Sequence, residues 1–126
     1  MRLTLIAITA LLSGCLPGEV FYTGQLSERD QAIFAEAARI EGAEVVDDPL
    51  ISAWRVEYEL MDGLSGLTVH SEKRILIDPE MPIGECTYAQ RALVVFRHEI
   101  GHTQGKGHSN DSTSVMHSPA PCYPTD

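Results

Sequence analysis

The spacing of apolar residues in the first half of the chain predicts an amphipathic helix. Between Ser27 and Gly42, apolar side chains recur every three or four positions, which is the period of an α-helix. Ser27 followed by Asp30 is a variant of the capping box, and Gly42 is suited to end the helix. We therefore predict a helix of about four turns between them. A short strand is expected before it, at residues 20–22.

The next part of the chain predicts three short strands. Residues 54–60 alternate between apolar and polar side chains, as expected of a strand with one buried face. Two further apolar runs, 67–69 and 74–77, predict strands joined by a tight turn. Residues 78–85 contain two prolines and a glycine and are expected to form a loop.

A second helix is predicted to begin at Thr87, which forms a capping box with Gln90. Residues 92–96 are apolar on every face, so this helix is expected to be buried. After Gly105 the chain is rich in turn-forming residues, and no third helix is expected. These elements predict one small α+β domain over residues 15–126, with a small twisted sheet, two helices and an irregular C-terminal part.

The first fifteen residues are typical of a bacterial export signal. Arg2 supplies positive charge, and residues 3–12 form an apolar run much shorter than the about 20 residues that span a bilayer. Residues 12–15 read LSGC, which resembles the lipobox of bacterial lipoproteins. This resemblance implies that residues 1–14 are removed and that an acylated Cys15 anchors the protein at the periplasmic face of an outer membrane or at the cell surface. The alternative is an ordinary signal peptide with an incidental cysteine.

Export also changes the interpretation of the two remaining cysteines, because exported proteins can keep disulfides. Cys86 and Cys122 form an even pair, which predicts one disulfide, with two free thiols as the alternative. Neither cysteine lies in a short metal-binding spacing, so neither is assigned to zinc.

The charge balance argues against nucleic acid as a partner. Lys and Arg number 9 against 18 Asp and Glu, for a formal net charge of -9. Binding to phosphates needs clustered Lys and Arg, and the longest basic run is Lys73-Arg74. No nucleic-acid partner is therefore expected.

The candidate chemistry lies in residues 98–108, which read HEIGHTQGKGH. His98 and His102 are four apart, so on a helix they share one face and can reach one ion. Eight residues along a straight helix span about 12 Å, so a third ligand requires the helix to end. Gly105 is expected to end it and to let the chain bring His108 back. Three neutral imidazoles with a fourth position open to water predict one catalytic Zn²⁺ ion.

Glu99 follows the first of these histidines and is expected to be the general base. Zinc lowers the pKa of a bound water from about 9 to about 7. Glu99 would take the proton of this water as it attacks a carbonyl and pass it to the leaving amine. The predicted activity is hydrolysis of peptide bonds, with a peptide or protein as the substrate.

Residues 98–116 resemble the metzincin clan of zinc endopeptidases, and within it the matrixins. The chain has the pattern HExxHxxGxxH, followed by SNDSTSVM, which places a methionine where that clan has its Met-turn. The resemblance implies a minimal metzincin-like catalytic domain. By position it implies roles for five residues: His98, His102 and His108 as zinc ligands, Glu99 as base, and Met116 as a hydrophobic floor beneath the metal. Ser118 departs from the pattern, because matrixins often have proline there.

Three other readings of the motif stay open. The histidines can form a structural metal site, although structural zinc usually has four protein ligands and favours cysteine. The protein can be a zinc-binding membrane lipoprotein or adaptor without turnover, which the short C-terminal part motivates. It can also hydrolyse a non-peptide amide, for instance in cell-wall material.

The remaining polar residues near the motif are given ordinary roles. His70 is expected to be a surface strand residue and His117 a solvated turn residue. Asp111 is expected to form a turn through its side-chain oxygen. Either 67–69 or 74–77 is expected to supply the sheet edge over the cleft, where a peptide can bind as an added strand.

Overall fold

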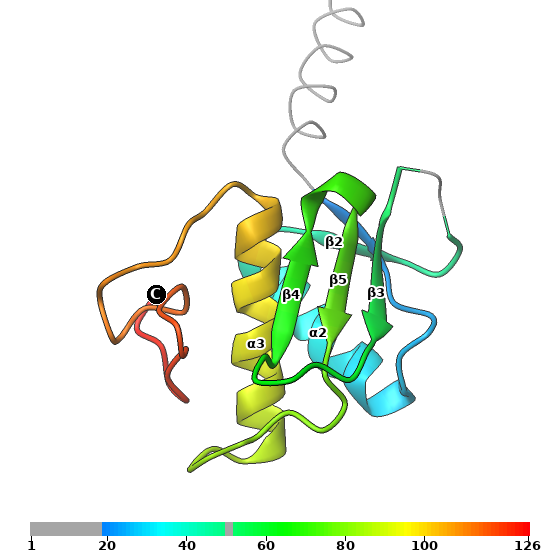
Figure 1. Cartoon of the computed structure of the whole chain (residues 1–126). Coiled ribbons are helices and arrows are strands. Elements are labelled where there is room, and N and C mark those ends of the chain that lie inside the picture. Colours follow the sequence, from blue (N-terminus) through cyan, green and yellow to red (C-terminus); the bar gives the residue numbers. More distant parts are fainter. Residues whose placement is uncertain (1–18, 50–51) are drawn as a thin grey trace, which may run out of the picture.

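The computed structural model describes residues 19–49 and 52–126, which form one sheet and two helices. The elements in chain order are β1 (Val20–Tyr22), α2 (Glu28–Glu41), β2 (Glu44–Val46), β3 (Trp54–Tyr58), β4 (Gly66–Val69), the 3₁₀-helix η1 (His70–Glu72), β5 (Arg74–Ile77) and α3 (Tyr88–Thr103). The strands pair in the order β2-β1-β3-β5-β4 (Figure 1). Within this described sheet, β4 alone runs antiparallel to its neighbour. The predicted α+β class is confirmed.

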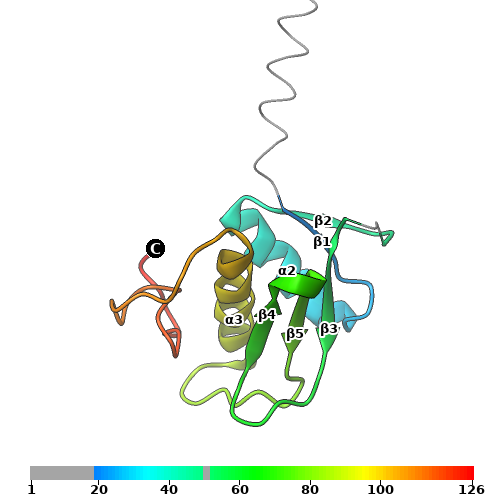
Figure 2. The same ribbon diagram turned by 45° about the horizontal axis from the view of Figure 1, so that its top comes forward.

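Both helices lie on one side of the sheet and pack against each other (Figure 2). Between the layers, the ring of Phe34 in α2 lies 5.4 Å from that of Phe21 in β1 and 5.2 Å from that of Phe96 in α3. All three side chains are fully buried. Burial of such a side chain contributes roughly 1.5–3 kcal/mol, so these contacts fix α3 firmly against the rest of the fold.

The first helix is stabilised by the caps that its sequence predicts. The Ser27 hydroxyl accepts a hydrogen bond from the backbone N–H of Asp30 at 3.2 Å. Gly42 ends the helix with a φ of 74°, in the left-handed region that glycine tolerates. The predicted bounds are therefore confirmed.

The strands differ from the prediction in detail. The predicted strand 54–60 ends at Tyr58, and the predicted strand 67–69 begins one residue earlier. The strand at 74–77 has its predicted bounds. Strand β2 was not predicted, because three residues carry too little periodicity; its backbone becomes a strand by pairing with β1.

The second helix begins as its capping box predicts. The N–H of Thr87 donates to the side-chain oxygen of Gln90 at 2.9 Å, and the N–H of Gln90 donates to the Thr87 hydroxyl at 3.2 Å. Most of α3 from Ala92 onward is buried, as the apolar run at 92–96 predicts. A buried helix is a rigid support for the side chains that it carries.

The C-terminal segment, residues 104–126, has no helix or strand in the described structure and lies beside α3, away from the sheet (Figure 1). A small apolar cluster joins the segment to α3; its members are Val94, Val115, Met116 and Ala120. A disulfide between Cys86 and Cys122 ties the segment to the loop before α3. The predicted disulfide is therefore confirmed.

The predicted signal sequence, residues 1–14, and Cys15 lie outside the described residues. None of the helices that the structure describes is both long and apolar enough to cross a membrane. Export and lipid anchoring therefore stay predictions from the sequence.

Candidate functional site

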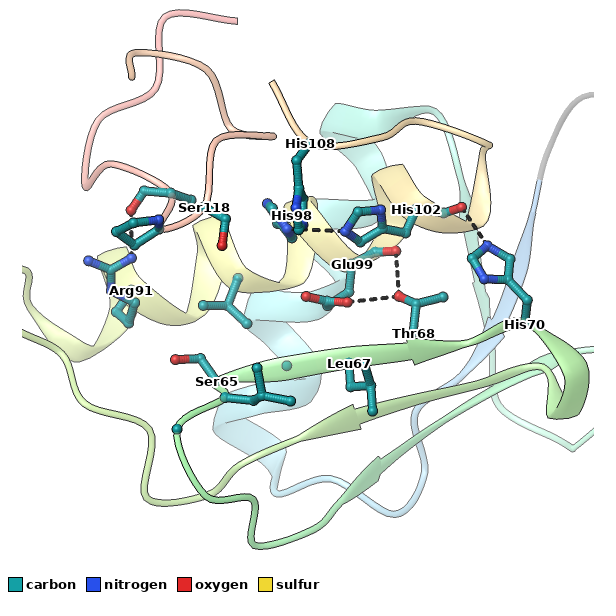
Figure 3. Close-up of a pocket in the computed structure, with 16 residues that line it drawn as sticks. Ser65, Leu67, Thr68, His70, Arg91, His98, Glu99, His102, His108 and Ser118 are labelled. Atoms are coloured by element: carbon teal, nitrogen blue, oxygen red, sulfur yellow. Dashed lines mark hydrogen bonds between the residues drawn. The ribbon is translucent and has the colours of Figure 1, made fainter. Parts of the chain in front are cut away.

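Three histidine side chains converge beside the C-terminal half of α3. His98 and His102 lie one turn apart on the helix, and His108 lies in the segment that follows it. One ring nitrogen from each of the three lies within 4.8 Å of the others (Figure 3). The convergence that the spacing predicts is confirmed, and these residues can hold a metal ion.

A Schellman turn brings the chain back toward the helix. Gly105 has a φ of 87°, in the region that favours glycine. Its N–H donates to the carbonyl of His102 at 3.0 Å, and the N–H of Lys106 donates to the carbonyl of Gly101 at 3.0 Å. Two of the last carbonyls of α3 are satisfied in this way, and the chain reverses as predicted for Gly105.

Backbone carbonyls orient two of the three imidazoles. Nδ1 of His98 lies 2.8 Å from the carbonyl oxygen of Val115, and Nδ1 of His102 lies 2.8 Å from that of Lys106. Because a carbonyl oxygen only accepts, each Nδ1 carries the proton, and each neutral ring presents the lone pair of Nε2. Histidines that bind metals are commonly fixed in this way. Burial lowers the pKa of His98, which favours its neutral, ligating form.

The distance between the two Nε2 atoms tests whether a metal ion fits. The Nε2 atoms of His98 and His102 lie 3.2 Å apart. With both Nδ1 atoms protonated, neither Nε2 can donate to the other, so two lone pairs face each other without attraction unless a cation lies between them. Two nitrogens bound tetrahedrally to one zinc at about 2.0–2.1 Å are roughly 3.3 Å apart. The two nitrogens are therefore spaced as a four-coordinate ion requires.

Glu99 lies next to this cluster in the same pocket. Its residue is only 5% exposed, and its Oε1 accepts a hydrogen bond from the Thr68 hydroxyl at 2.8 Å. Burial raises the pKa of Glu99, while the Thr68 hydrogen bond and the nearby His102 act in the opposite direction. A carboxylate with a raised pKa accepts a proton more readily at neutral pH.

Strand β4 approaches Glu99 this closely because residue 66 is glycine. A Cβ at Gly66 would lie 2.9 Å from Cγ and 3.1 Å from Oε2 of Glu99. Thr68 is two residues further along and faces the same side of the strand. One edge strand therefore provides both the space for the Glu99 side chain and its hydrogen bond.

Met116 packs against α3 at Gly101. A Cβ at Gly101 would lie 2.5 Å from the sulfur of Met116, so any larger residue there would displace the Met116 side chain. Met116 is itself buried, at 5% exposure. This packing is compatible with the hydrophobic floor that the family resemblance implies for Met116.

The histidines and Glu99 line a pocket of about 390 Å³ between β4 and the C-terminal segment, with α3 as its floor (Figure 3). Strand β4 is the edge of the sheet, whereas β5 lies between β3 and β4. Of the two strands that were expected at this edge, 67–69 is therefore the correct one. The half of the pocket away from His102 is lined by residues 63–65 and 118–120.

Three other residues were given roles from the sequence. His70 lies in η1, so its predicted strand position is wrong. It lines the pocket, and its Nε2 lies 2.9 Å from the carbonyl oxygen of His102. It is not part of the histidine cluster. His117 has a ring nitrogen 2.9 Å from the carbonyl of Pro119. Asp111 forms a turn, as predicted, by accepting from the N–H of Thr113 at 2.9 Å.

Sequence reasoning did not identify Gly66, Thr68 or Gly101. The first two meet Glu99 across more than thirty residues of chain, and no spacing rule relates a strand to a helix at that separation. Gly101 did leave a signal. A glycine inside a helix costs about 1 kcal/mol relative to alanine, so its presence in an apolar helix indicates a close approach.

A search of protein-family models finds no match to this chain, and a search of curated proteins also finds none. The family resemblance therefore depends on the motif at residues 98–116. The metal site depends on that motif and on the geometry described above.

Proposed function

We propose that this chain is a zinc-dependent endopeptidase, similar to the matrixins among the metzincins, that hydrolyses peptide bonds with Glu99 as general base. The observation that carries the proposal is the buried carboxylate of Glu99 in one pocket with the three histidines. Structural zinc sites normally have four protein ligands. Among residues 19–49 and 52–126, no fourth His, Cys, Asp or Glu joins the cluster.

His98, His102 and His108 would hold the ion. Zinc suits this donor set, because it binds imidazole nitrogen and commonly has three protein ligands in catalytic sites. When bound, zinc would polarise the scissile carbonyl and lower the pKa of a water at its open position.

Glu99 would handle the protons of the reaction. The Thr68 hydroxyl occupies Oε1, which leaves Oε2 to accept a proton from the attacking water. The water oxygen then forms a bond to the carbonyl carbon, the carbon–nitrogen bond breaks, and Glu99 returns the proton to the leaving amine. A positioned base of this kind contributes about 10²–10⁴-fold to the rate.

Strand β4 would align the substrate. It is an edge strand of the described sheet, antiparallel to β5, and its residues 66–68 line the pocket. An extended peptide can add to such an edge through main-chain hydrogen bonds. The scissile bond would then lie between β4 and the histidine cluster.

We further propose that the protein is exported and anchored to a membrane through a lipid on Cys15. The disulfide between Cys86 and Cys122 supports export, because disulfides persist in oxidising compartments and are rare in the cytosol. Replacing Cys15 with alanine should shift the protein from the membrane fraction to the soluble fraction. Unchanged fractionation would contradict the anchor.

Digestion of casein and of a peptide library by zinc-loaded protein tests the activity. Glu99→Ala should lower kcat by at least about 10²-fold while zinc content stays at the wild-type level. Glu59→Ala removes an exposed carboxylate outside the pocket and should leave turnover unchanged. Turnover by Glu99→Ala at the wild-type rate would refute the base.

The same assay distinguishes the alternatives. Stoichiometric zinc without hydrolysis of any peptide would favour a zinc-binding lipoprotein or adaptor without turnover. Hydrolysis of a non-peptide amide alone, with the same dependence on Glu99, would keep the mechanism and change the substrate class.

A further inference from the structure

The pocket extends well beyond the histidines, along α3 toward the N-terminus of the helix. Arg91 lies seven residues before His98, which is almost two full turns, so both face the same side of α3. Their Cα atoms are about 10 Å apart along the helix axis. Figure 3 shows Arg91 at the end of the pocket opposite His102, below Ser118.

Arg91 is held by one backbone contact and has no acidic partner. Its Nη1 donates to the carbonyl of Ala120 at 2.7 Å, which fixes the guanidinium against the C-terminal segment. Its Nε is buried and has no hydrogen-bond partner. In the part of the chain that the structure describes, no carboxylate lies within ion-pair distance of Arg91.

Among the described cations without an acidic partner, Arg91 is distinguished by its place in the pocket. Five of the eight described Lys and Arg residues have acidic partners, and Arg55, Lys73 and Arg91 have none. Of these three, Arg91 is the one that lines the pocket. An N–H that is buried without an acceptor is costly to the side chain that carries it. A ligand would contact the part of the guanidinium that lines the pocket, because Nε itself is buried. A carboxylate is the best match, because it accepts charge-assisted hydrogen bonds from the planar guanidinium group.

We propose that Arg91 determines substrate specificity by binding an acidic side chain close to the scissile bond. The inference rests on the proposed endopeptidase function and names the substrate class of the same site. The Cα atoms of Arg91 and His98 are about 10 Å apart along the helix, and consecutive Cα atoms of a substrate are about 3.8 Å apart. A glutamate or aspartate one or two residues from the scissile bond would therefore reach Arg91. The apolar side chains of Val95 and Pro119 line the space between and would contact the methylene groups of that side chain.

The negative charge of the whole chain does not oppose this preference at short range. Solvent-exposed charges further away than the Debye length, about 8 Å at physiological ionic strength, are largely screened. Glu99, the acidic residue that lines the pocket, lies eight residues from Arg91, or about 12 Å along the helix. Besides Arg91 and Glu99, no Lys, Arg, Asp or Glu of the described residues lines the pocket.

The test compares peptides that carry Glu, Gln or Lys at each position flanking the cleavage site. With zinc-loaded wild-type protein, kcat/KM for the Glu peptide should exceed that for the isosteric Gln peptide by about 10-fold or more at the position that reaches Arg91. Arg91→Gln should reduce this ratio to about one, and Arg91→Glu should shift the preference toward Lys. Arg55→Glu makes the same charge change outside the pocket and should leave the ratio unchanged.

The ratio of kcat/KM for the Glu and Gln peptides separates recognition of the acidic side chain from a structural role of Arg91. Loosening the Ala120 contact would lower kcat/KM for all peptides equally and leave this ratio unchanged. Equal losses in the Arg91 variants, or a wild-type ratio near one, would overturn the role of Arg91 while leaving the endopeptidase function intact. Binding of the same peptides to the zinc-loaded Glu99→Ala variant gives a second reading that needs no turnover. Equal Kd values for the Glu and Gln peptides there would also overturn the inference, whereas failure of the wild type to cleave any peptide would contradict the proposed function itself.

Discussion

At the scale of single residues, the site depends on two glycines as much as on the histidines. Gly66 lets β4 approach Glu99, and Gly101 lets the sulfur of Met116 reach the backbone of α3. Both are glycines in regular structure, where glycine is normally unfavourable. Their cost to the fold is offset by close contacts that a larger residue would displace.

Replacing Gly101 with alanine should therefore destabilise the protein, although alanine normally favours a helix by about 1 kcal/mol. The added methyl group would lie 2.5 Å from Met116 Sδ. We expect a loss of about 1–3 kcal/mol in the free energy of unfolding, as for other overpacked cores, together with weaker zinc binding. Urea unfolding and a zinc titration measure the two effects.

Gly107→Ala is the matched control, because no atom lies within 4 Å of a Cβ at that position. Its stability should stay within about 0.5 kcal/mol of the wild type. A Gly101→Ala protein as stable as Gly107→Ala would contradict the close contact with Met116.

At the scale of elements, the sequence predicts what is local. The capping box at Thr87, the four-residue spacing of His98 and His102, and the glycine at 105 each act within one helix or its end, and all appear where expected. Strand β2 and the contact of Thr68 with Glu99 depend on which strands pair and which edge meets α3. Such nonlocal contacts leave no periodic trace in the sequence.

One nonlocal network connects the elements that position α3. The carboxylate of Asp30 in α2 is fully buried and accepts hydrogen bonds from the hydroxyls of Tyr58 in β3 and Tyr88 in α3. The Tyr88 oxygen lies 2.9 Å and 3.1 Å from the two carboxylate oxygens. The network therefore joins the sheet and both helices at the N-terminal end of α3.

Removing the hydroxyl in Tyr88→Phe should lower the free energy of unfolding by about 1–3 kcal/mol, because Asp30 would lose a hydrogen bond while staying buried.

Burial and the adjacent Asp30 raise the pKa of Tyr88 to about 12. Since this is above the ordinary value of about 10, the folded state holds the proton longer. The stabilisation by Tyr88 is therefore complete below about pH 10 and is lost as the pH rises toward 12.

Urea unfolding at pH 8 and near pH 11 tests this dependence. The stability difference between wild type and Tyr88→Phe should be smaller at the higher pH. Tyr123→Phe, which changes an exposed tyrosine, serves as the control. A difference that is equal at both pH values would contradict the assignment.

At the scale of the whole molecule, one wall of the pocket is a segment without regular structure. Residues 104–126 provide His108, Met116 and the carbonyl that orients His98. Asp126 fixes this segment by accepting hydrogen bonds from the N–H of Val115 at 2.8 Å and the hydroxyl of Ser114 at 2.7 Å. The path of this segment could not be predicted, because it has neither helical nor strand periodicity.

The disulfide between Cys86 and Cys122 should therefore be important for both stability and metal binding. It closes a loop with a sequence separation of 36 residues, and such bonds typically contribute about 2–4 kcal/mol. The double variant Cys86→Ser/Cys122→Ser should lose stability by this amount and bind zinc more weakly. A reductant should weaken the wild type but leave the double variant unchanged, and equal stability of the two oxidised proteins would contradict this role.

X-ray absorption spectroscopy at the zinc edge is the sharpest test of the proposed site, because it reports the ligands of the ion itself. The proposed catalytic site should hold one zinc per chain, bound by three imidazole nitrogens at about 2.0–2.1 Å and one water oxygen. His108→Ala should lose one imidazole from the spectrum, while His117→Ala should keep all three. Sulfur ligands in the wild type, four protein imidazoles, or a spectrum that His108→Ala leaves unchanged would contradict the proposed site.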